Sequence, residues 1–348
     1  MFNPELFITN KILTNIVNIE KEILVLNASD ITTQQKIKLK ATSKALYLFH
    51  AAHMIGYNIG LKDAEKISEG KVFDQENHNV VVLNNIRNLH EFIRSSLQDE
   101  YIDIDSSILL HMNKILLSNW KEVWEVRFRN PQLIEDTDWN DWLHLTDKTI
   151  EPLTLQDELR SAFDWYKITT QKLYPLIRIA ILIYRLIQIA PFSHLNKFTI
   201  IGASDFLLRK NGYISEDYLS TFRFFDSNNS LFKDVIAKIS IENPNDLTLW
   251  VEHFTESLSR ELKSVSMDIQ EFAKANPKQK KTFLDLNKRQ LKILKYLQTI
   301  PTIKREDYVQ IMEVSTMTAF RDLNDLVTKK LLKVDGRGRA TRYHLANR

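Results

Sequence analysis

The sequence contains no cysteine and little glycine or proline. Its 348 residues include 7 glycines and 8 prolines. The lack of cysteine excludes disulfide bonds and metal sites built from thiolates. The scarcity of glycine and proline favours an α-rich fold with few hairpins, because tight turns depend on these two residues.

The sequence also predicts neither a membrane segment nor a signal peptide. No apolar run is long enough to cross a bilayer. The first residues, MFNPELFITNK, contain no basic region followed by an apolar core. We therefore expect a cytoplasmic protein with no membrane partner. The composition, 44% hydrophobic and 26% charged, is that of a globular protein, and the length predicts two or three domains.

Charge is distributed unevenly along the chain. Residues 278–348 contain 17 Lys and Arg against 7 Asp and Glu, a net charge of +10. The preceding residues contain 30 and 37, a net charge of −7, so the overall value of +3 conceals a basic C-terminal part. This asymmetry indicates a polyanionic partner for that part.

The most apolar stretch runs from Leu176 to Ala190. Its only polar side chains are those of Arg178, Arg185 and Gln188, which lie on one narrow stripe of a helix. The stretch therefore predicts a buried central helix, ended by Pro191. A short loop at residues 193–196 and a second helix to about residue 210, closed by Asn211-Gly212, are expected to follow. Free amides at the second helix could bind an anion.

The segments IYRLIQIAPFSHLNKF and LLRKNGYI resemble sequences of the Fic (Fido) family, most members of which transfer AMP from ATP to a protein hydroxyl. The family signature is His-Pro-Phe-x-(Asp/Glu)-Gly-Asn-Gly-Arg, with a second Arg three positions later. The same frame here reads Ala190-Pro191-Phe192-Ser193-His194-Leu195-Asn196-Lys197-Phe198, followed by Ile201. The resemblance implies a mainly α fold: an N-terminal helical part at 1–100 and a Fic core at 101–275, with a possible small β-hairpin flap.

The functional positions of this motif differ from the family pattern. Ala190 stands where the family has its general base, so no catalytic residue is predicted. His194 replaces the acidic magnesium ligand and is a poor ligand for that oxygen-seeking ion. Phe198 and Ile201 replace the two arginines that hold phosphates.

The remaining motif positions leave a weak candidate for nucleotide or anion binding. Leu195 and Lys197 replace the two glycines, and Asn196 is the only polar position retained. His194, Asn196 and Lys197 are the predicted nucleotide-binding residues. No metal site and no cofactor are expected, and ATP and Mg²⁺ become relevant only if the transferase activity described below is retained.

Several other segments carry weaker signals. Helices are expected at about residues 7–25, 34–55, 79–96, 106–120 and 243–274, and a linker at 275–281. In many Fic proteins a helix carries an inhibitory Glu, which would align here with Gly56. Arg127 could lie at the start of the flap, and residues 135–141 form an acidic loop. His50 and His53 lie three apart without an evident carboxylate partner, so a core or surface role is favoured over metal binding.

The basic C-terminal part, 278–348, resembles a winged helix-turn-helix domain, a frequent C-terminal partner of Fic domains. Helices are expected at 286–297, 304–312 and 316–330, followed by a hairpin around Asp335-Gly336. A helix of this kind enters the DNA major groove, and its wing meets phosphates or the minor groove. The predicted DNA-binding residues are Ser315, Thr316, Thr318 and Arg321 on the helix and Arg337, Arg339 and Arg342 on the wing. The alternative is a protein-interaction domain with a solvated basic face.

Two functions follow from these features. The first is a pseudoenzyme that regulates transcription by binding DNA through its winged helix, with the Fic core as a dimerisation or ligand-sensing body. The second is an AMP or nucleotidyl transferase that modifies a protein hydroxyl with a rearranged active site. DNA is therefore the expected partner, and a homodimer and a protein target are further candidates.

Overall fold

The computed structural model describes residues 2–28, 31, 33–72, 74, 76–120, 128–129, 154–214, 218–274, 286–329, 331–336, 338 and 341–346. The chain divides into two compact units. One consists of Met1–Asn27 and Thr42–Ser266, and the other of Ala28–Ala41 and Met267–Arg348. The flap, the acidic loop, Arg127 and the linker at 275–281 lie outside the described residues.

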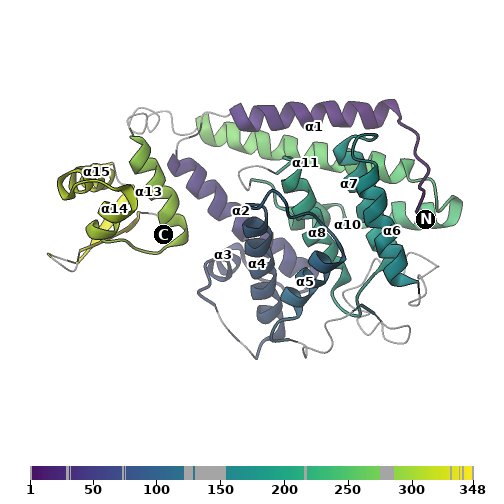
Figure 1. The fold of residues 1–348 in the computed structure, drawn as a ribbon, viewed down its shortest axis with the longest axis horizontal. Coiled ribbons are helices and arrows are strands. Elements are labelled where there is room, and N and C mark those ends of the chain that lie inside the picture. The colour runs from purple at the N-terminus through teal and green to yellow at the C-terminus, as the bar shows by residue number, and fades with distance from the viewer. Residues whose placement is uncertain are drawn as a thin grey trace. The chain divides into compact units, whose positions relative to one another are not determined.

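The first unit is entirely helical over its described elements, which confirms the mainly α fold class (Figure 1). Its helices are α1 (Asn10–Ala28), α2 (Thr33–Met54), α3 (Leu61–Ser68), α4 (His78–Ser96), α5 (Ser106–Leu117), α6 (Leu155–Ile168), α7 (Pro175–Ile189), α8 (Asn196–Lys210), α9 (Thr221–Ser227), α10 (Asn229–Glu242) and α11 (Thr248–Lys274). The beginning of α2 and the end of α11 belong to the second unit.

Helix α7 is the buried central helix that the sequence predicts, and its polar stripe faces α6. Arg178 Nη1 donates to the Tyr166 carbonyl at 2.9 Å and to Thr170 Oγ1 at 2.8 Å. Arg185 Nη2 lies 2.5 Å from Glu158 Oε2. The terminal nitrogens of both arginines thus find partners on α6 or directly after it, whereas the buried Nε atom of each has no hydrogen-bond partner.

Helix α8 is buried along most of its length and packs against α4, α5, α7 and α9. The two helices α8 and α4 approach closely at Gly202, where an added Cβ would lie 2.8 Å from Leu89 Cδ2 of α4. On the other side of α7, Trp250 of α11 donates from Nε1 to the Ala180 carbonyl at 2.7 Å. These contacts fix both helices that flank the motif loop.

The expected helices at 7–25, 34–55, 79–96, 106–120 and 243–274 are confirmed as α1, α2, α4, α5 and α11, with shifts of a few residues at their ends. The cap after α8 is also confirmed, because Gly212 has φ +81°. Helices α3, α6, α9 and α10 were not predicted. None of the helices in the described part of the chain is both long and apolar enough to cross a membrane.

The second unit contains α13 (Lys288–Thr299), α14 (Arg305–Met312), α15 (Thr316–Thr328), β1 (Leu332–Asp335) and β2 (Arg342–Leu345). The two strands pair antiparallel, and a bridge between Ile303 and Tyr343 adds a third short segment. Three helices and a hairpin confirm the predicted order of elements. Ile37, from the beginning of α2, packs against the apolar core of this unit.

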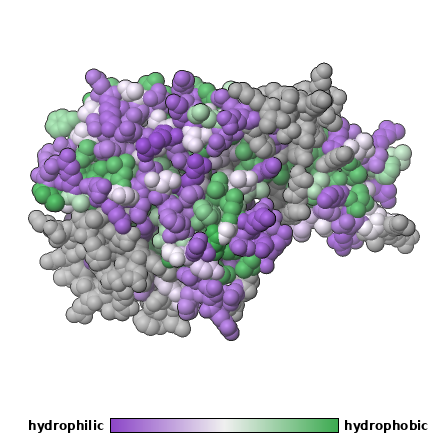
Figure 2. Space-filling model, turned by 180° about the vertical axis from the view of Figure 1, so that it is seen from behind, coloured by the Kyte–Doolittle hydropathy of each residue, from purple (hydrophilic) through white to green (hydrophobic). Residues whose placement is uncertain are grey.

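Apolar and polar side chains are interspersed on the surface that Figure 2 shows, where hydrophobic residues form separate green patches among hydrophilic ones. Most large apolar side chains are buried, but several on α1 are not.

Candidate functional site

The loop between α7 and α8 carries the motif frame and has two unusual backbone positions. Ala190 ends α7 with φ 44° and ψ 66°, and Leu195 precedes α8 with φ 55° and ψ 32°. Both lie in the left-handed region, which is uncommon for residues other than glycine. The surrounding structure must therefore stabilise this loop.

Asn196 closes the loop on itself. Its Oδ1 accepts a hydrogen bond from the Phe192 amide at 2.8 Å, and its Nδ2 donates to the Phe192 carbonyl at 2.6 Å. Both groups of the side-chain amide are thus used within the loop. The polar motif residue that the sequence retains has a structural role here.

Arg129 stabilises the end of α7, and sequence reasoning missed it. Its Nε donates to the Ala190 carbonyl at 2.7 Å and its Nη2 to the Ile189 carbonyl at 3.1 Å. A cation at a helix C-terminus satisfies the last carbonyls and opposes the helix dipole. Burial lowers the pKa of the Arg129 guanidinium. The neighbouring Phe128 stacks on Phe192, with ring centroids 5.5 Å apart.

The predicted nucleotide-binding residues are buried inside the first unit. His194 and Lys197 are each 3% exposed and Asn196 is 2% exposed. The His194 carbonyl accepts a hydrogen bond from Asn113 Nδ2 at 2.9 Å, and Asn113 Nδ2 also lies 3.0 Å from Thr199 Oγ1. The structure therefore brings the three residues together at the start of α8, with their side chains turned away from solvent.

His50 and His53 have a carboxylate partner, contrary to the expectation from the sequence. Their Nδ1 atoms lie 2.7 and 2.8 Å from the two oxygens of Asp226, which belongs to α9. Burial alone would raise the pKa of Asp226, but the hydrogen bonds and charges of the two histidines lower it. Among the described residues no group of three or more His, Cys, Asp or Glu side chains is arranged to hold a metal ion.

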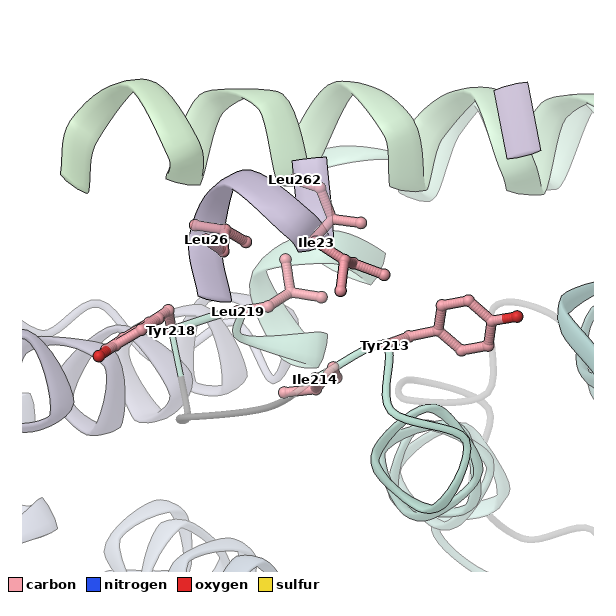
Figure 3. A pocket seen from close by; sticks show the side chains of 7 residues that line it. All are labelled: Ile23, Leu26, Tyr213, Ile214, Tyr218, Leu219 and Leu262. Carbon is pink, nitrogen blue, oxygen red and sulfur yellow. The ribbon is translucent and has the colours of Figure 1, made fainter. Parts of the chain in front are cut away.

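A recess in the first unit lies between α1, α11 and the segment that follows α8 (Figure 3). Leucine and isoleucine side chains meet at its centre, while the hydroxyls of both tyrosines point away from it. A ligand there would find few polar groups to orient it. Its lining residues are Ile23, Leu26, Tyr213, Ile214, Tyr218, Leu219 and Leu262.

Helix α15 of the second unit carries four of the predicted DNA-binding residues at its N-terminal end. Ser315 Oγ caps the helix by accepting from the Thr318 amide at 3.2 Å and also lies 3.0 Å from Thr318 Oγ1. Thr316 and Arg321 are exposed. Ser315 is thus the N-cap residue of α15, and its hydroxyl is already bonded to the start of the helix.

Three further exposed side chains on α15 were missed by the sequence analysis: Met317, Phe320 and Asn324. They alternate at helical spacing with the buried Ala319 and Leu323. That alternation was visible in the sequence, because the residues between the buried positions must face outward.

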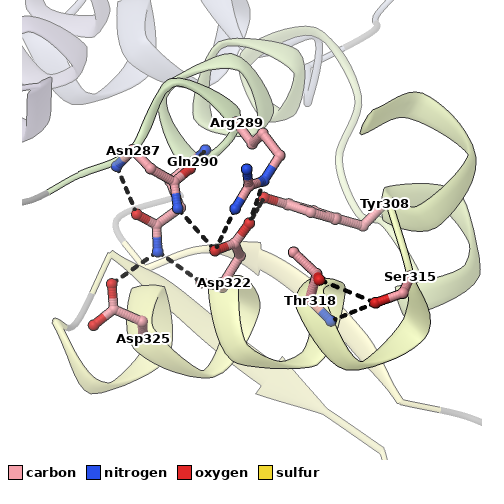
Figure 4. Close-up of polar contacts among 8 residues, drawn as sticks. All are labelled: Asn287, Arg289, Gln290, Tyr308, Ser315, Thr318, Asp322 and Asp325. Carbon is pink, nitrogen blue, oxygen red and sulfur yellow. Dashed lines mark hydrogen bonds and ion pairs between the residues drawn. The ribbon is translucent and has the colours of Figure 1, made fainter. Parts of the chain in front are cut away.

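The opposite side of α15 is anchored by Asp322 (Figure 4). Its carboxylate accepts hydrogen bonds from Asn287 Nδ2 at 2.8 Å, from Arg289 Nε at 2.9 Å and from the Tyr308 hydroxyl at 2.9 Å. Gln290 Nε2 donates to the Asp322 carbonyl at 3.1 Å. Asp322 therefore links α15 to α14 and to the start of α13.

The charge state of this cluster follows from its contacts. Burial would raise the pKa of Asp322, but the hydrogen bonds from Arg289, Asn287 and Tyr308 lower it. Burial and the bond to the carboxylate raise the pKa of the Tyr308 hydroxyl. Asp322 is thus an ionised acceptor and Tyr308 a neutral donor at neutral pH.

The hairpin places Arg342 opposite Asp335 at the end of the strand pair next to the connecting loop. Arg342 is exposed, and its Nη1 lies 3.4 Å from Thr302 Oγ1. Lys333 on β1 is exposed as well. Arg337 and Arg339, the other predicted wing contacts, lie outside the described residues.

Comparisons with known proteins agree with both units. A family model for a DeoR-like helix-turn-helix domain matches residues 289–343. A search among curated proteins found no match.

Solved structures of three Fic proteins have a similar fold. A Fic family protein from Desulfovibrio desulfuricans G20 is 15% identical and has a TM-score of 0.58, over 100% of this chain and 99% of that one. A Fic-domain-containing signaling protein from Bacteroides thetaiotaomicron VPI-5482 is 15% identical with a TM-score of 0.55, over 75% and 98%. Fic-1 from C. elegans is 15% identical with a TM-score of 0.55, over 76% and 71%. The chain therefore has the fold of Fic family proteins and carries a C-terminal DeoR-like helix-turn-helix domain.

Proposed function

We propose that this protein is a cytoplasmic, DNA-binding transcription regulator that acts through its winged helix. The observation that carries the proposal is the exposed face of α15, which is held from behind by Asp322 in a helix-turn-helix domain. A helix that reads DNA must present its side chains from a rigid support, because a loose helix would lose the geometry of base contacts.

The side chains on that face suit the major groove. Arg321 has the donors that pair with guanine, and Thr316 is small and polar. The exposed Met317 and Phe320 offer apolar contact to thymine methyl groups, and Asn324 offers an amide suited to adenine. Ser315 and Thr318, which bond to each other at the helix start, are better placed to support the N-terminal turn near a phosphate.

The wing and the net charge supply the binding that does not depend on sequence. Arg342 and Lys333 are exposed on the hairpin, and Arg337 and Arg339 are close to them in the chain. Each phosphate that such a cation neutralises releases counterions, which favours binding at low salt. These residues would position the domain while α15 selects the sequence.

The Fic-fold unit is proposed to be catalytically inactive because its motif is degenerate. Ala190 has no group that can take a proton, and losing a general base costs about two to four orders of magnitude in rate. His194 is a poor magnesium ligand, and Phe198 cannot hold a phosphate. The loop's retained amide, that of Asn196, is already bonded to Phe192.

Fluorescence anisotropy with labelled duplexes tests the DNA proposal on the full chain. Binding is expected at low salt, and Arg321→Ala and Arg342→Ala should each weaken it. Arg160→Ala is the matched control, because this exposed arginine on α6 has only a solvent-exposed ion pair with Asp157. Failure of the full chain to bind any duplex at low salt would refute the proposal and favour a protein-interaction domain.

Incubation with labelled ATP and Mg²⁺ or Mn²⁺ tests the proposal that the Fic-fold unit is catalytically inactive. No incorporation into the protein itself is expected, and neither is tight ATP binding by calorimetry. Micromolar ATP affinity abolished by Lys197→Ala, or transfer of the label, would instead support a nucleotidyl transferase with a rearranged site.

A further inference from the structure

Two large apolar side chains lie next to each other on the exposed face of α15. Met317 is 63% exposed and Phe320 is 45% exposed. They are three positions apart, so they are neighbours on the helix surface. In the described part of this unit, the apolar core includes Ala319 and Leu323 of the same helix but neither Met317 nor Phe320. An exposed apolar pair rimmed by polar side chains indicates a contact with another molecule.

The charges on α15 favour DNA as that molecule. Arg321 is exposed and, at 100° per residue, lies about 40° from Met317 around the helix. Both carboxylates of the helix are bonded within their own unit. Asp322 accepts hydrogen bonds from α13 and α14 (Figure 4), and Asp325 Oδ2 lies 2.6 Å from Lys329 Nζ. The exposed face therefore presents a cation beside apolar side chains, in a part of the chain with a net charge of +10.

This combination of a cation and an apolar pair fits one kind of base step. In the major groove guanine presents the acceptors N7 and O6, to which an arginine can donate, and thymine presents a C5 methyl group. Stacked bases are about 3.4 Å apart along one strand. Side chains four positions apart on a helix have Cβ atoms about 5–6 Å apart. Arg321 can therefore reach a guanine while Met317 contacts the methyl group of the adjacent pyrimidine.

We propose that Met317 and Phe320 bind the C5 methyl group of a pyrimidine next to a guanine held by Arg321. The inference rests on the proposed function and extends it to a class of modified DNA. 5-Methylcytosine carries the same methyl group as thymine and takes its place in this contact. Cytosine and uracil lack the methyl group and are bound more weakly, so methylation of a cytosine beside a guanine strengthens binding.

Removal of a single methyl group from the DNA tests the contact. The full chain first selects a duplex from a random pool, and each thymine of that duplex is then replaced in turn by deoxyuridine, which lacks only the methyl group. At a thymine next to a guanine the affinity should fall about fourfold, the factor that corresponds to the roughly 0.8 kcal/mol of one buried methyl group. Cytosine at that position should also weaken binding, and methylation of the cytosine should regain a similar factor.

The ratio of the affinities for the thymine and uracil duplexes separates the methyl contact from general binding. In Met317→Ala and Phe320→Ala this ratio should move toward one. Both side chains are exposed, so these variants should keep the wild-type melting temperature. Met267→Ala is the matched control, since this methionine of α11 is 55% exposed in the same unit and should leave the ratio unchanged. Arg342→Ala should weaken binding to both duplexes alike and also preserve the ratio.

The outcomes distinguish this inference from the proposed function. Equal affinity for thymine and uracil at every position of a duplex that the wild type binds would overturn the methyl contact and leave the DNA proposal intact. A ratio unchanged in both Met317→Ala and Phe320→Ala would overturn it as well. Altered sedimentation of DNA-free Met317→Ala would show that the pair binds another copy of the chain instead. A wild-type chain that binds no duplex would refute the DNA proposal and this inference with it.

Discussion

At the scale of single residues, the loop between α7 and α8 shows how neighbouring side chains hold an uncommon backbone conformation. Ala190 has a left-handed conformation at the end of α7. Arg129 stabilises it by donating hydrogen bonds to the carbonyls of Ile189 and Ala190, and Asn196 closes the loop that follows. The conformation does not depend on a catalytic side chain at position 190.

This gives the first prediction. Ala190→His should fold and should still transfer no AMP, because a base alone supplies neither the magnesium ligand nor the phosphate-binding arginines. Incubation with labelled ATP and Mg²⁺ measures transfer, and an unchanged melting temperature controls for folding. Strong self-modification by this single variant would show that the rest of the pocket is functional.

A second residue-scale prediction concerns Asp226. Its pKa is lowered on folding, so its ionised form stabilises the protein above the ordinary aspartate pKa of about 4, and that stabilisation is lost as pH falls through the lower folded value. Asp226→Asn should therefore destabilise the protein by about 1 kcal/mol at pH 7, and by progressively less below about pH 4.

Thermal unfolding at several pH values measures this difference. Asp234→Asn, at an exposed position on α10, is the control and should change little at any pH. A constant difference between Asp226→Asn and the wild type down to pH 3 would show that the histidine contacts do not depend on the charge of the carboxylate.

At the scale of elements, the close approach of α8 and α4 predicts that Gly202→Ala lowers the stability of the protein, whereas helix propensity alone would predict an increase. Gly202→Ala should favour the helix by up to about 1 kcal/mol, but its methyl would lie 2.8 Å from Leu89 Cδ2, and such crowding costs about 1–3 kcal/mol. We expect a lower melting temperature. Gly60→Ala, with an ordinary φ of −79° and an open surrounding, should be neutral. A higher melting temperature of Gly202→Ala would contradict the close packing of α8 against α4.

The exposed face of α15 gives another element-scale prediction. Phe320→Ala should change the preference among DNA sequences at a thymine position by about 1 kcal/mol, since only the base contact is lost. The salt dependence of DNA binding by Phe320→Ala should match that of the wild type. Competition binding with a random duplex pool measures the preference, and an unaltered preference would remove Phe320 from the reading face.

The elements that could be predicted are those with a strong local pattern. Helices α7 and α8 follow from the apolar run, the proline and the Asn211-Gly212 cap, and the hairpin follows from glycine and alternating residues. Helices α3, α6 and α10 are amphipathic, so their pattern could have been predicted from the sequence. The partners of Asp226 and Arg129 could not be predicted, because they lie about 60 to 180 residues away in the chain and meet only through packing.

At the scale of the whole molecule, the division of charge sets the expected salt dependence. Because residues 278–348 are basic, the DNA affinity should fall as the salt concentration rises. In a plot of the logarithm of affinity against the logarithm of salt concentration, the slope should be about −0.9 for each neutralised phosphate. A slope of a few units is expected, and Arg342→Ala should reduce it by about one while weakening all sequences alike. A slope near zero would mean that phosphates contribute little.

The anchoring of α15 has a consequence for how such proteins can diverge. Asp322, Arg289 and Tyr308 hold the helix from one side, whereas Thr316, Phe320 and Arg321 occupy the other. Substitutions on the outer side leave the support untouched. Under the proposed function, the DNA preference of α15 can therefore change at little cost in folding, because the supporting residues behind the helix stay in place.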